Sequence, residues 1–66
     1  MQISINGQAR NAPDGFTVAA LLGELDLQGK RLAVEVNEDV IPRSEHPAHV
    51  LCDGDRVEIV HAIGGG

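Results

Sequence analysis

The sequence predicts an α+β domain, in which a mixed sheet of four to five strands is covered on one face by one main helix. Alternating apolar and polar residues at 1–6, 32–37 and 56–60 are typical of half-buried strands. Asn6-Gly7 is a strong signal for a two-residue hairpin turn. Apolar residues at helical spacing between 18 and 25 indicate one amphipathic helix. A hairpin and a helix that must bury its apolar side together favour the α+β class.

The first hairpin follows from its pattern. Met1, Ile3 and Ile5 share one face of the first strand. After the turn, residues 8–12 return as a weaker strand. Residues 13–15, Pro-Asp-Gly, then form a turn, because Pro fixes φ and Gly accepts a left-handed conformation.

The helix has start and stop signals. Thr17 is a plausible N-cap. Phe16 and Leu21 occupy the two positions of a hydrophobic staple. Gly23 should weaken the helix by about 1 kcal/mol relative to Ala. Gly29 marks the far end of this segment.

The second half of the chain contains two clear strands. Residues 32–37 alternate with their apolar side chains inward, and residues 40–41 form a short strand that Pro42 confines to an edge or ends. Residues 43–52 are irregular, and a proline within them prevents a regular helix. Residues 56–60 form the last strand.

We expect one core from the inward positions of these elements. Its predicted members are Ile3, Ile5, Phe16, Val18, Leu21, Leu22, Leu25, Val34, Val36, Val57 and Ile59.

Length and composition exclude several classes of function. A chain of 66 residues is one domain. It has no Trp or Tyr and a net charge of −5, which argues against nucleic-acid binding. The longest apolar run, residues 18–22, is too short to span a membrane. The single Cys52 and the lack of a secretory signal favour a reducing, cytoplasmic location.

The glycine tail is the most unusual segment. Gly64-Gly65-Gly66 adds no packing and is costly to order, so a folded domain gains nothing from it. A terminus that threads a narrow channel in a partner would use such residues. We therefore expect a folded domain at 1–60 and a flexible tail at 61–66, with the α-carboxylate of Gly66 as the reactive group. The alternative is a frayed end without function.

Several motifs together resemble a known family. They are Ile3-Ser-Ile-Asn-Gly7, Phe16-Thr-Val-x-x-Leu-Leu22, Val34-x-Val-Asn-x-x-x-Ile-Pro-Arg43, Asp53-Gly-Asp-x-Val-x-Ile59 and the terminal Gly-Gly. In this order, over the whole chain, they resemble the sulfur-carrier protein of thiamine (thiazole) biosynthesis. The resemblance implies the ubiquitin-like β-grasp fold. It also implies a protein that is not an enzyme.

The resemblance further implies a mechanism and partners. An adenylating enzyme of the ubiquitin-activating type uses ATP to activate the carboxylate of Gly66, so the carrier itself binds no cofactor. Sulfur from a persulfide donor protein replaces AMP, and the thiocarboxylate serves thiazole synthase. Gly65, Gly64 and Ile63 would thread into the partner. The third glycine from the end, Gly64, stands where many members of that family have a larger residue, which puts the recognition of the tail at Ile63 in question.

Three other functions stay open from the sequence. The sulfur-carrying small subunit of molybdopterin synthase shares the fold and the chemistry, although that family tends to be longer and to carry prolines before its Gly-Gly. A ubiquitin-like modifier would join lysines through the same carboxylate. A β-grasp interaction module would have an inert tail.

The histidines and the cysteine do not predict a metal site. His46, His49 and Cys52 are spaced by three and His61 is a possible fourth ligand, but Pro47 interrupts them. We therefore expect solvated loop histidines and a partly buried Cys52. The acidic residues Glu24, Asp26, Glu35, Glu38, Asp39 and Glu58 fall at outward positions.

One apolar pair suggests a docking surface. Val60 has outward parity on the last strand, and Ile41 lies beside Val40 in the short strand. If Ile41 and Val60 both face outward, they could begin a patch that binds the adenylating enzyme. Scattered surface apolar residues are the alternative.

Overall fold

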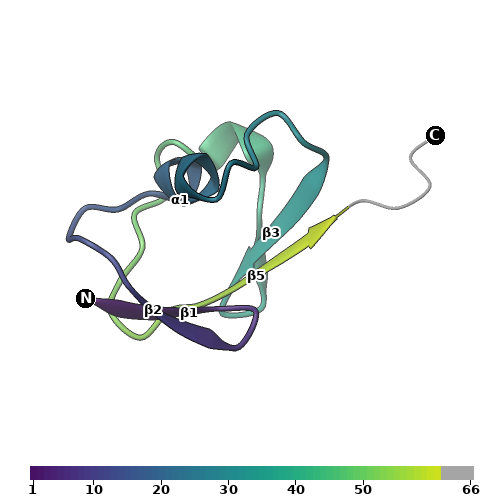
Figure 1. Ribbon diagram of the computed structural model, residues 1–66. Helices are drawn as coiled ribbons and strands as arrows, with labels where there is room; N and C mark the ends of the chain where they lie inside the picture. The colour runs from purple at the N-terminus through teal and green to yellow at the C-terminus, as the bar shows by residue number, and fades with distance from the viewer. Residues whose placement is uncertain (62–66) are drawn as a thin grey trace.

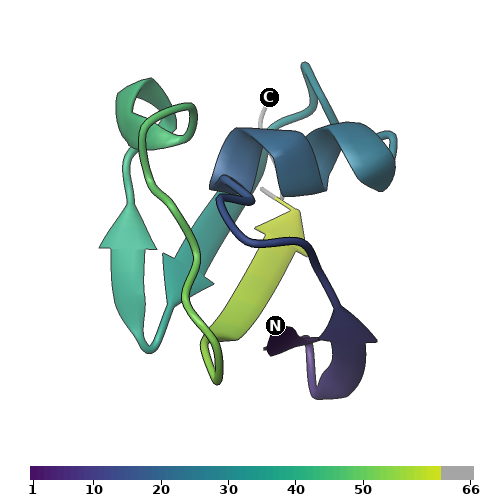
Figure 2. The same cartoon turned by 90° about the vertical axis from the view of Figure 1, so that its left-hand side faces the viewer.

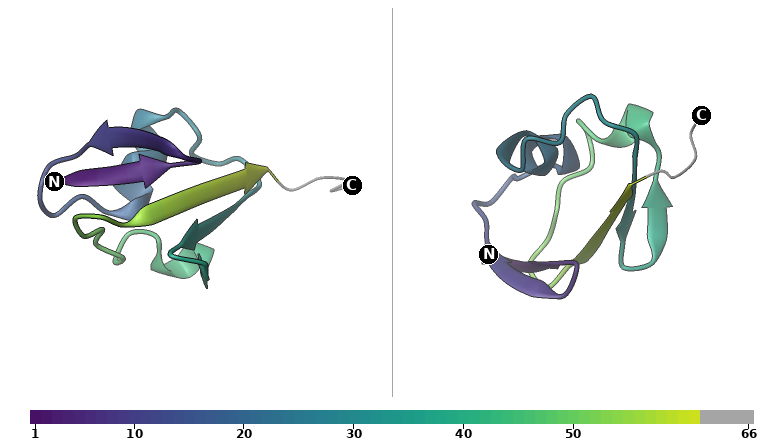
Figure 3. Two further views of the ribbon diagram at one scale, coloured as in Figure 1. Left: turned by 90° about the horizontal axis from the view of Figure 1, so that it is seen from below. Right: turned by 45° about the vertical axis from the view of Figure 1, so that its right-hand side comes forward.

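The computed structural model describes residues 1–61. Its elements in order are β1 (Gln2–Ile5), β2 (Gln8–Asn11), α1 (Val18–Glu24), β3 (Leu32–Val36), β4 (Asp39–Ile41), the short 3₁₀ helix η1 (Arg43–Glu45) and β5 (Arg56–His61). The strands form one sheet, and α1 lies across one face of it (Figures 1 and 2). Among residues 1–61, no helix lies in front of the other face, as the left view in Figure 3 shows.

The sheet is mixed, and β5 is its middle strand. The strand order is β2-β1-β5-β3-β4. β5 runs parallel to β1 and antiparallel to β3, while β1–β2 and β3–β4 are antiparallel hairpins. The α+β class and a mixed sheet of four to five strands are therefore confirmed, and the observed number is five. β5 continues through His61, one residue past the predicted end of the domain.

Both hairpins turn in two residues. Asn6 and Gly7 have φ of 49° and 86°, which confirms the left-handed turn expected from Asn-Gly. Asn37 and Glu38 close the β3–β4 hairpin with φ of 52° and 74°. Glu38 is therefore held in a left-handed conformation, which is energetically unfavourable for a residue that has a Cβ atom.

The N-terminus of α1 is capped by one side chain and by the irregular loop. Thr17 accepts a hydrogen bond at Oγ1 from the backbone N–H of Ala20 at 3.1 Å, which confirms it as the N-cap. The carbonyls of His49 and His46 accept from the N–H groups of Val18 and Ala19, each at 3.0 Å. The first three N–H groups of the helix thus have partners, so residues 46–49 are fixed against it.

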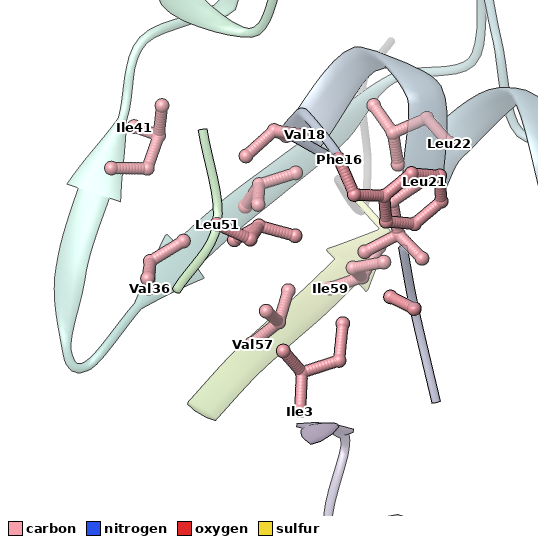
Figure 4. Close-up of a cluster of buried hydrophobic side chains, with 12 residues drawn as sticks. Ile3, Phe16, Val18, Leu21, Leu22, Val36, Ile41, Leu51, Val57 and Ile59 are labelled. Atoms are coloured by element: carbon pink, nitrogen blue, oxygen red, sulfur yellow. The ribbon is translucent and has the colours of Figure 1, made fainter. Parts of the chain in front are cut away.

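One core fills the space between α1 and the sheet (Figure 4). The buried hydrophobic residues are Ile3, Ala12, Phe16, Val18, Leu21, Leu22, Val34, Val36, Ile41, Leu51, Val57 and Ile59. Ile5 and Leu25, which were predicted to be core members, lie half-buried against this cluster. The predicted helix register is right, because Leu22 is only 7% exposed.

The prediction that Ile41 faces outward is wrong. Ile41 is 8% exposed, whereas its neighbour Val40 is 65% exposed. Ile41 pairs with Val34 in the antiparallel β3–β4 ladder, and directly opposite residues point to the same side of a sheet. Because Val34 faces the core, Ile41 must do so too.

Two further predictions about burial are wrong. Cys52 is exposed, not partly buried, because the core position in this segment belongs to Leu51. The backbone N–H of Leu51 donates to the carbonyl of Phe16 at 2.8 Å. This hydrogen bond fixes the orientation of the segment, so that Leu51 faces the core and Cys52 faces outward. His46 is 7% exposed and not solvated. Its Nε2 lies 3.0 Å from the carbonyl oxygen of Ile41 and donates to it, since a carbonyl can only accept.

Candidate functional site

The predicted reactive segment follows the middle strand of the sheet. β5 pairs with β3 through Leu32 and His61, the last residue that the structure describes. The predictions for Ile63, Gly64, Gly65 and Gly66 lie outside the described residues and stay predictions. What the structure does describe is the strand from which that segment departs.

Two asparagine side chains anchor β5 on its two sides. Asn6 accepts at Oδ1 from the N–H of Ile59 at 2.9 Å and donates from Nδ2 to the carbonyl of Ile59 at 3.3 Å. Asn37 accepts at Oδ1 from the N–H of Arg56 at 2.9 Å. The direct β1–β5 ladder pairs only Ser4 and Ile5 with β5. Asn6 therefore extends the attachment of β5 toward the glycine segment beyond the end of that ladder.

Val60 is 53% exposed and lies on the helix-free face of the sheet, as its parity predicts. It pairs with Ala33, and Val40 pairs with Glu35 on the same face. We call Val40, Ala33 and Val60 the valine patch. It is the closest observed counterpart of the predicted Ile41–Val60 pair, with Val40 in place of Ile41.

Carboxylates adjoin the valine patch. Glu35 stands opposite both Val40 and Glu58 in the sheet register. Glu38 and Arg56 help to line a shallow hollow on the same face, together with Glu58. In a chain of net charge −5, this face combines apolar side chains with negative charge. A partner with an apolar centre and basic surroundings would complement it.

The register of β4 could have been found from the sequence. Asn37-Glu38 is a two-residue turn, so Val36 must pair with Asp39 and Val34 with Ile41. Counting across the turn then places Val40 outward. The missed signal was the length of the turn, not the apolar character of the strand.

The side chains of the histidines and of Cys52 do not form one metal-binding group. His46 is buried beside Ile41, His49 is half-buried, and Cys52 and His61 are exposed. Within residues 1–61 no group of three or more His, Cys, Asp or Glu side chains could hold a metal ion. No helix in that range is long and apolar enough to cross a membrane.

Comparison with known proteins identifies the family. The chain matches a family model described as the ThiS family over residues 3–66. It is 36% identical over 66 residues to the sulfur carrier protein ThiS of Escherichia coli, and the match spans 100% of both chains. A protein of the same name from Bacillus subtilis is 35% identical over 65 residues, which are 97% of this chain and 98% of that protein.

A longer relative matches over the same residues. Thiazole synthase of Paramagnetospirillum magneticum is 46% identical over 66 residues, which are 20% of that protein. A second thiazole synthase, from Magnetococcus marinus, is 42% identical and is likewise covered to 20%. The chain thus spans about a fifth of the length of these two relatives.

A solved structure supports the same assignment. The crystal structure of the thiamine biosynthesis protein ThiS from Geobacter metallireducens is similar with a TM-score of 0.87 and 32% identity, and 100% of each chain is covered. The β-grasp fold expected from the sequence resemblance is therefore confirmed. Because the sequence motifs, the strand order and the family model agree over nearly the whole length, this chain belongs to the ThiS family.

Proposed function

We propose that this chain is a sulfur carrier protein of thiamine biosynthesis, acting as a protein co-substrate and not as an enzyme. The observation that carries the proposal is the family match over residues 3–66, which includes the glycine segment. The relatives from Escherichia coli and Bacillus subtilis that are named sulfur carrier proteins match over nearly their whole length. The similarity is therefore to complete carriers.

The proposed chemistry takes place on the α-carboxylate of Gly66. A carboxylate is a poor electrophile, so a partner enzyme transfers AMP from ATP to one of its oxygens and releases pyrophosphate. The terminal sulfur of a protein persulfide attacks the acyl carbon, and AMP leaves. A second thiol then attacks the donor's sulfur in the acyl disulfide, which releases the thiocarboxylate and leaves the donor and the second thiol joined in a disulfide. The carrier contributes the acyl group, and the partners contribute the reagents.

The glycines would give the activating enzyme access to this carboxylate. Without Cβ atoms, Gly64 and Gly65 can lie extended in a channel too narrow for side chains. Ile63 would be the last residue with a side chain to be recognised. Support comes from β5, which is the middle strand and is tied to β1 and β3. A firmly held strand gives the threading segment a fixed point of departure.

The valine patch would dock the adenylating enzyme. Val40 and Val60 are two of the large apolar side chains that the described residues leave exposed, and both lie on the helix-free face. Glu35 and Glu58 lie beside them in the register. Negative charge around an apolar centre would steer the carrier toward a basic partner surface and speed their encounter.

Thiazole synthase would accept the sulfur. Two relatives named thiazole synthase contain a segment similar to this chain within one longer protein. Fusion raises the effective concentration of one part for the other, which is useful when the two must meet repeatedly. This supports thiazole synthase as the acceptor of the sulfur.

Mass spectrometry of the protein isolated from cells grown without thiamine tests the proposal. We expect a fraction of the chains to carry sulfur in place of one oxygen at Gly66, and this fraction to fall when thiamine is supplied. An isopeptide conjugate to lysine would instead identify a modifier. An unmodified acid under both conditions would contradict the proposal.

A further inference from the structure

A hollow of about 300 Å³ lies on the side of the sheet that carries α1, away from the valine patch. Its apolar lining includes Leu22 of α1, Leu27 of the following loop, Leu32 at the start of β3 and Pro47 after η1. The right view of Figure 3 shows this loop running from α1 to the start of β3. We call this hollow the leucine pocket.

The walls of the leucine pocket are fixed by hydrogen bonds. The N–H of Leu27 donates to the carbonyl of Leu22 at 2.8 Å, which folds the loop back onto α1. On the opposite wall, the N–H of Ala19 donates to the carbonyl of His46 at 3.0 Å, and the His46 ring donates to Ile41. The pocket is thus formed before any ligand arrives, as binding pockets usually are.

The edge of the leucine pocket is basic in an otherwise acidic chain. Lys30 and Arg43 both line it. The chain has 5 Lys and Arg against 10 Asp and Glu, so two basic side chains at one hollow are a local excess of positive charge. The Arg43 guanidinium donates through Nη2 to the carbonyl of Lys30 at 3.1 Å. With five N–H donors, it can hold the loop and a ligand carboxylate at once.

We propose that the leucine pocket docks a segment of a partner protein in which one apolar side chain lies next to carboxylates. Ligand pockets have volumes of roughly 300–1,000 Å³, so the leucine pocket is at the small end of this range. It suits a single side chain better than a whole cofactor. The charge is complementary to acidic residues, whereas the valine patch adjoins carboxylates of its own. Two faces of opposite charge would let the carrier be held by two different proteins.

Peptide titration followed by ¹H–¹⁵N NMR of the 66-residue chain tests this inference. The probe is acetyl-Gly-Asp-Leu-Glu-Gly-amide. One control peptide replaces Leu by Gly, and a second replaces Asp and Glu by Asn and Gln. We expect the probe to give saturable shifts of the amides of Leu27, Lys30 and Arg43. Each control should bind at least about tenfold more weakly, since each lacks one of the two recognised features.

Matched variants locate the site. Lys30→Gln and Arg43→Gln should each weaken probe binding several-fold, while Arg56→Gln, which removes the same charge from the helix-free face, should leave it unchanged. Lys30→Gln separates charge from structure, because the hydrogen bonds of Lys30 to Arg43 and Leu27 use its backbone carbonyl and N–H and not its side chain. None of these readouts depends on sulfur transfer, so their failure is distinguishable from failure of the proposed function.

Several results would overturn the inference. They are shifts centred on Val40 and Val60, equal binding of the neutral peptide, and the absence of saturation in the millimolar range. Pocket shifts that grow with protein concentration alone would assign the pocket to a second copy of the chain. Pocket shifts on removal of residues 62–66, with no peptide present, would assign it to the chain's own end.

Discussion

At the scale of single residues, Asn6 serves both a turn and a strand. Its backbone takes φ of 49° to start the first hairpin turn. Its side chain supplies a donor and an acceptor to the backbone of Ile59, 53 residues away. An asparagine is suited to both tasks, because it tolerates the left-handed conformation and its amide imitates a peptide group.

Asn6→Gly separates these two tasks. Glycine adopts the positive φ easily, so the substitution removes only the side-chain bonds to Ile59. We expect a loss of about 1–3 kcal/mol in the free energy of unfolding, because two part-buried backbone groups lose partners. Glu38→Gly is the matched control: it relieves a positive φ of 74° and should be neutral or stabilising in urea unfolding. Equal stability of both variants would contradict this role for Asn6.

Leu22 tests the core at the same scale. Its side chain is 7% exposed and lies between α1 and the sheet. Leu22→Ala should cost about 2–5 kcal/mol, a large part of the stability of so small a domain. Leu27→Ala, at a half-buried position, should cost clearly less. Denaturant unfolding measures both, and a smaller loss for Leu22→Ala than for Leu27→Ala would contradict the observed packing.

At the scale of elements, the irregular segment after β4 completes the short helix α1. Seven residues make few internal hydrogen bonds, and Gly23 lowers helix propensity further. The carbonyls of His46 and His49 accept hydrogen bonds from two of the N–H groups that have no partner within the helix, and the Thr17 side chain accepts from a third. Loop and helix therefore stabilise each other.

Thr17→Ala tests this capping arrangement. The variant loses the acceptor for the N–H of Ala20, and we expect a cost of about 1 kcal/mol. Thr17→Ser keeps an acceptor oxygen and should retain most of the stability. Thermal unfolding of the two variants gives the comparison. If Thr17→Ser loses as much as Thr17→Ala, the side-chain oxygen is not what stabilises the helix end.

The elements also show what the sequence could and could not predict. The structure confirms the predicted strand alternation, the Asn6-Gly7 turn and the Thr17 cap, because each depends on residues close together in the chain. The burial of His46 was not, since it depends on the carbonyl of Ile41 and on contact with α1. The outward side chain of Val40 needed the register between two strands. Local chemistry is visible in a sequence, whereas long-range pairing is only partly so.

At the scale of the whole molecule, the two sides of the sheet differ in charge. The helix-free side presents the valine patch beside carboxylates, and the side with α1 presents the leucine pocket with its basic edge. The middle strand β5 runs between them toward the glycine segment. The two proposed docking sites would let a small carrier offer separate contacts to separate partners.

Charged substitutions in the valine patch test the docking proposal. Val40→Glu and Val60→Glu should keep the fold, because both side chains are more than half exposed. Each should weaken binding to the adenylating enzyme about tenfold or more, which is ~1.4 kcal/mol. Ile41→Glu should instead unfold the protein, since it buries a charge. Gln8→Glu adds the same charge at an exposed position remote from the patch. Calorimetric titration should find that this variant binds the adenylating enzyme with unchanged affinity. Unchanged affinity for both valine variants would remove the docking proposal.

The glycine segment is the part of the molecule on which the proposed function depends most. Gly65→Val adds a branched side chain where the channel of the activating enzyme is expected to be narrowest. The folded domain should be unaffected, which NMR spectra of the variant can establish. Ala20→Val, an exposed helix position, is the control for the added bulk.

The most direct measurement is the rate at which the adenylating enzyme, with ATP and a persulfide donor, converts each variant to the thiocarboxylate, followed by mass spectrometry of the intact protein. The parent and Ala20→Val should be converted at similar rates, Gly65→Ala more slowly, and Gly65→Val at least about a hundredfold more slowly, which is ~2.7 kcal/mol in the barrier. Conversion of Gly65→Val as fast as the parent would show that the glycines do not serve passage through a channel, and would contradict this account of how the carrier works.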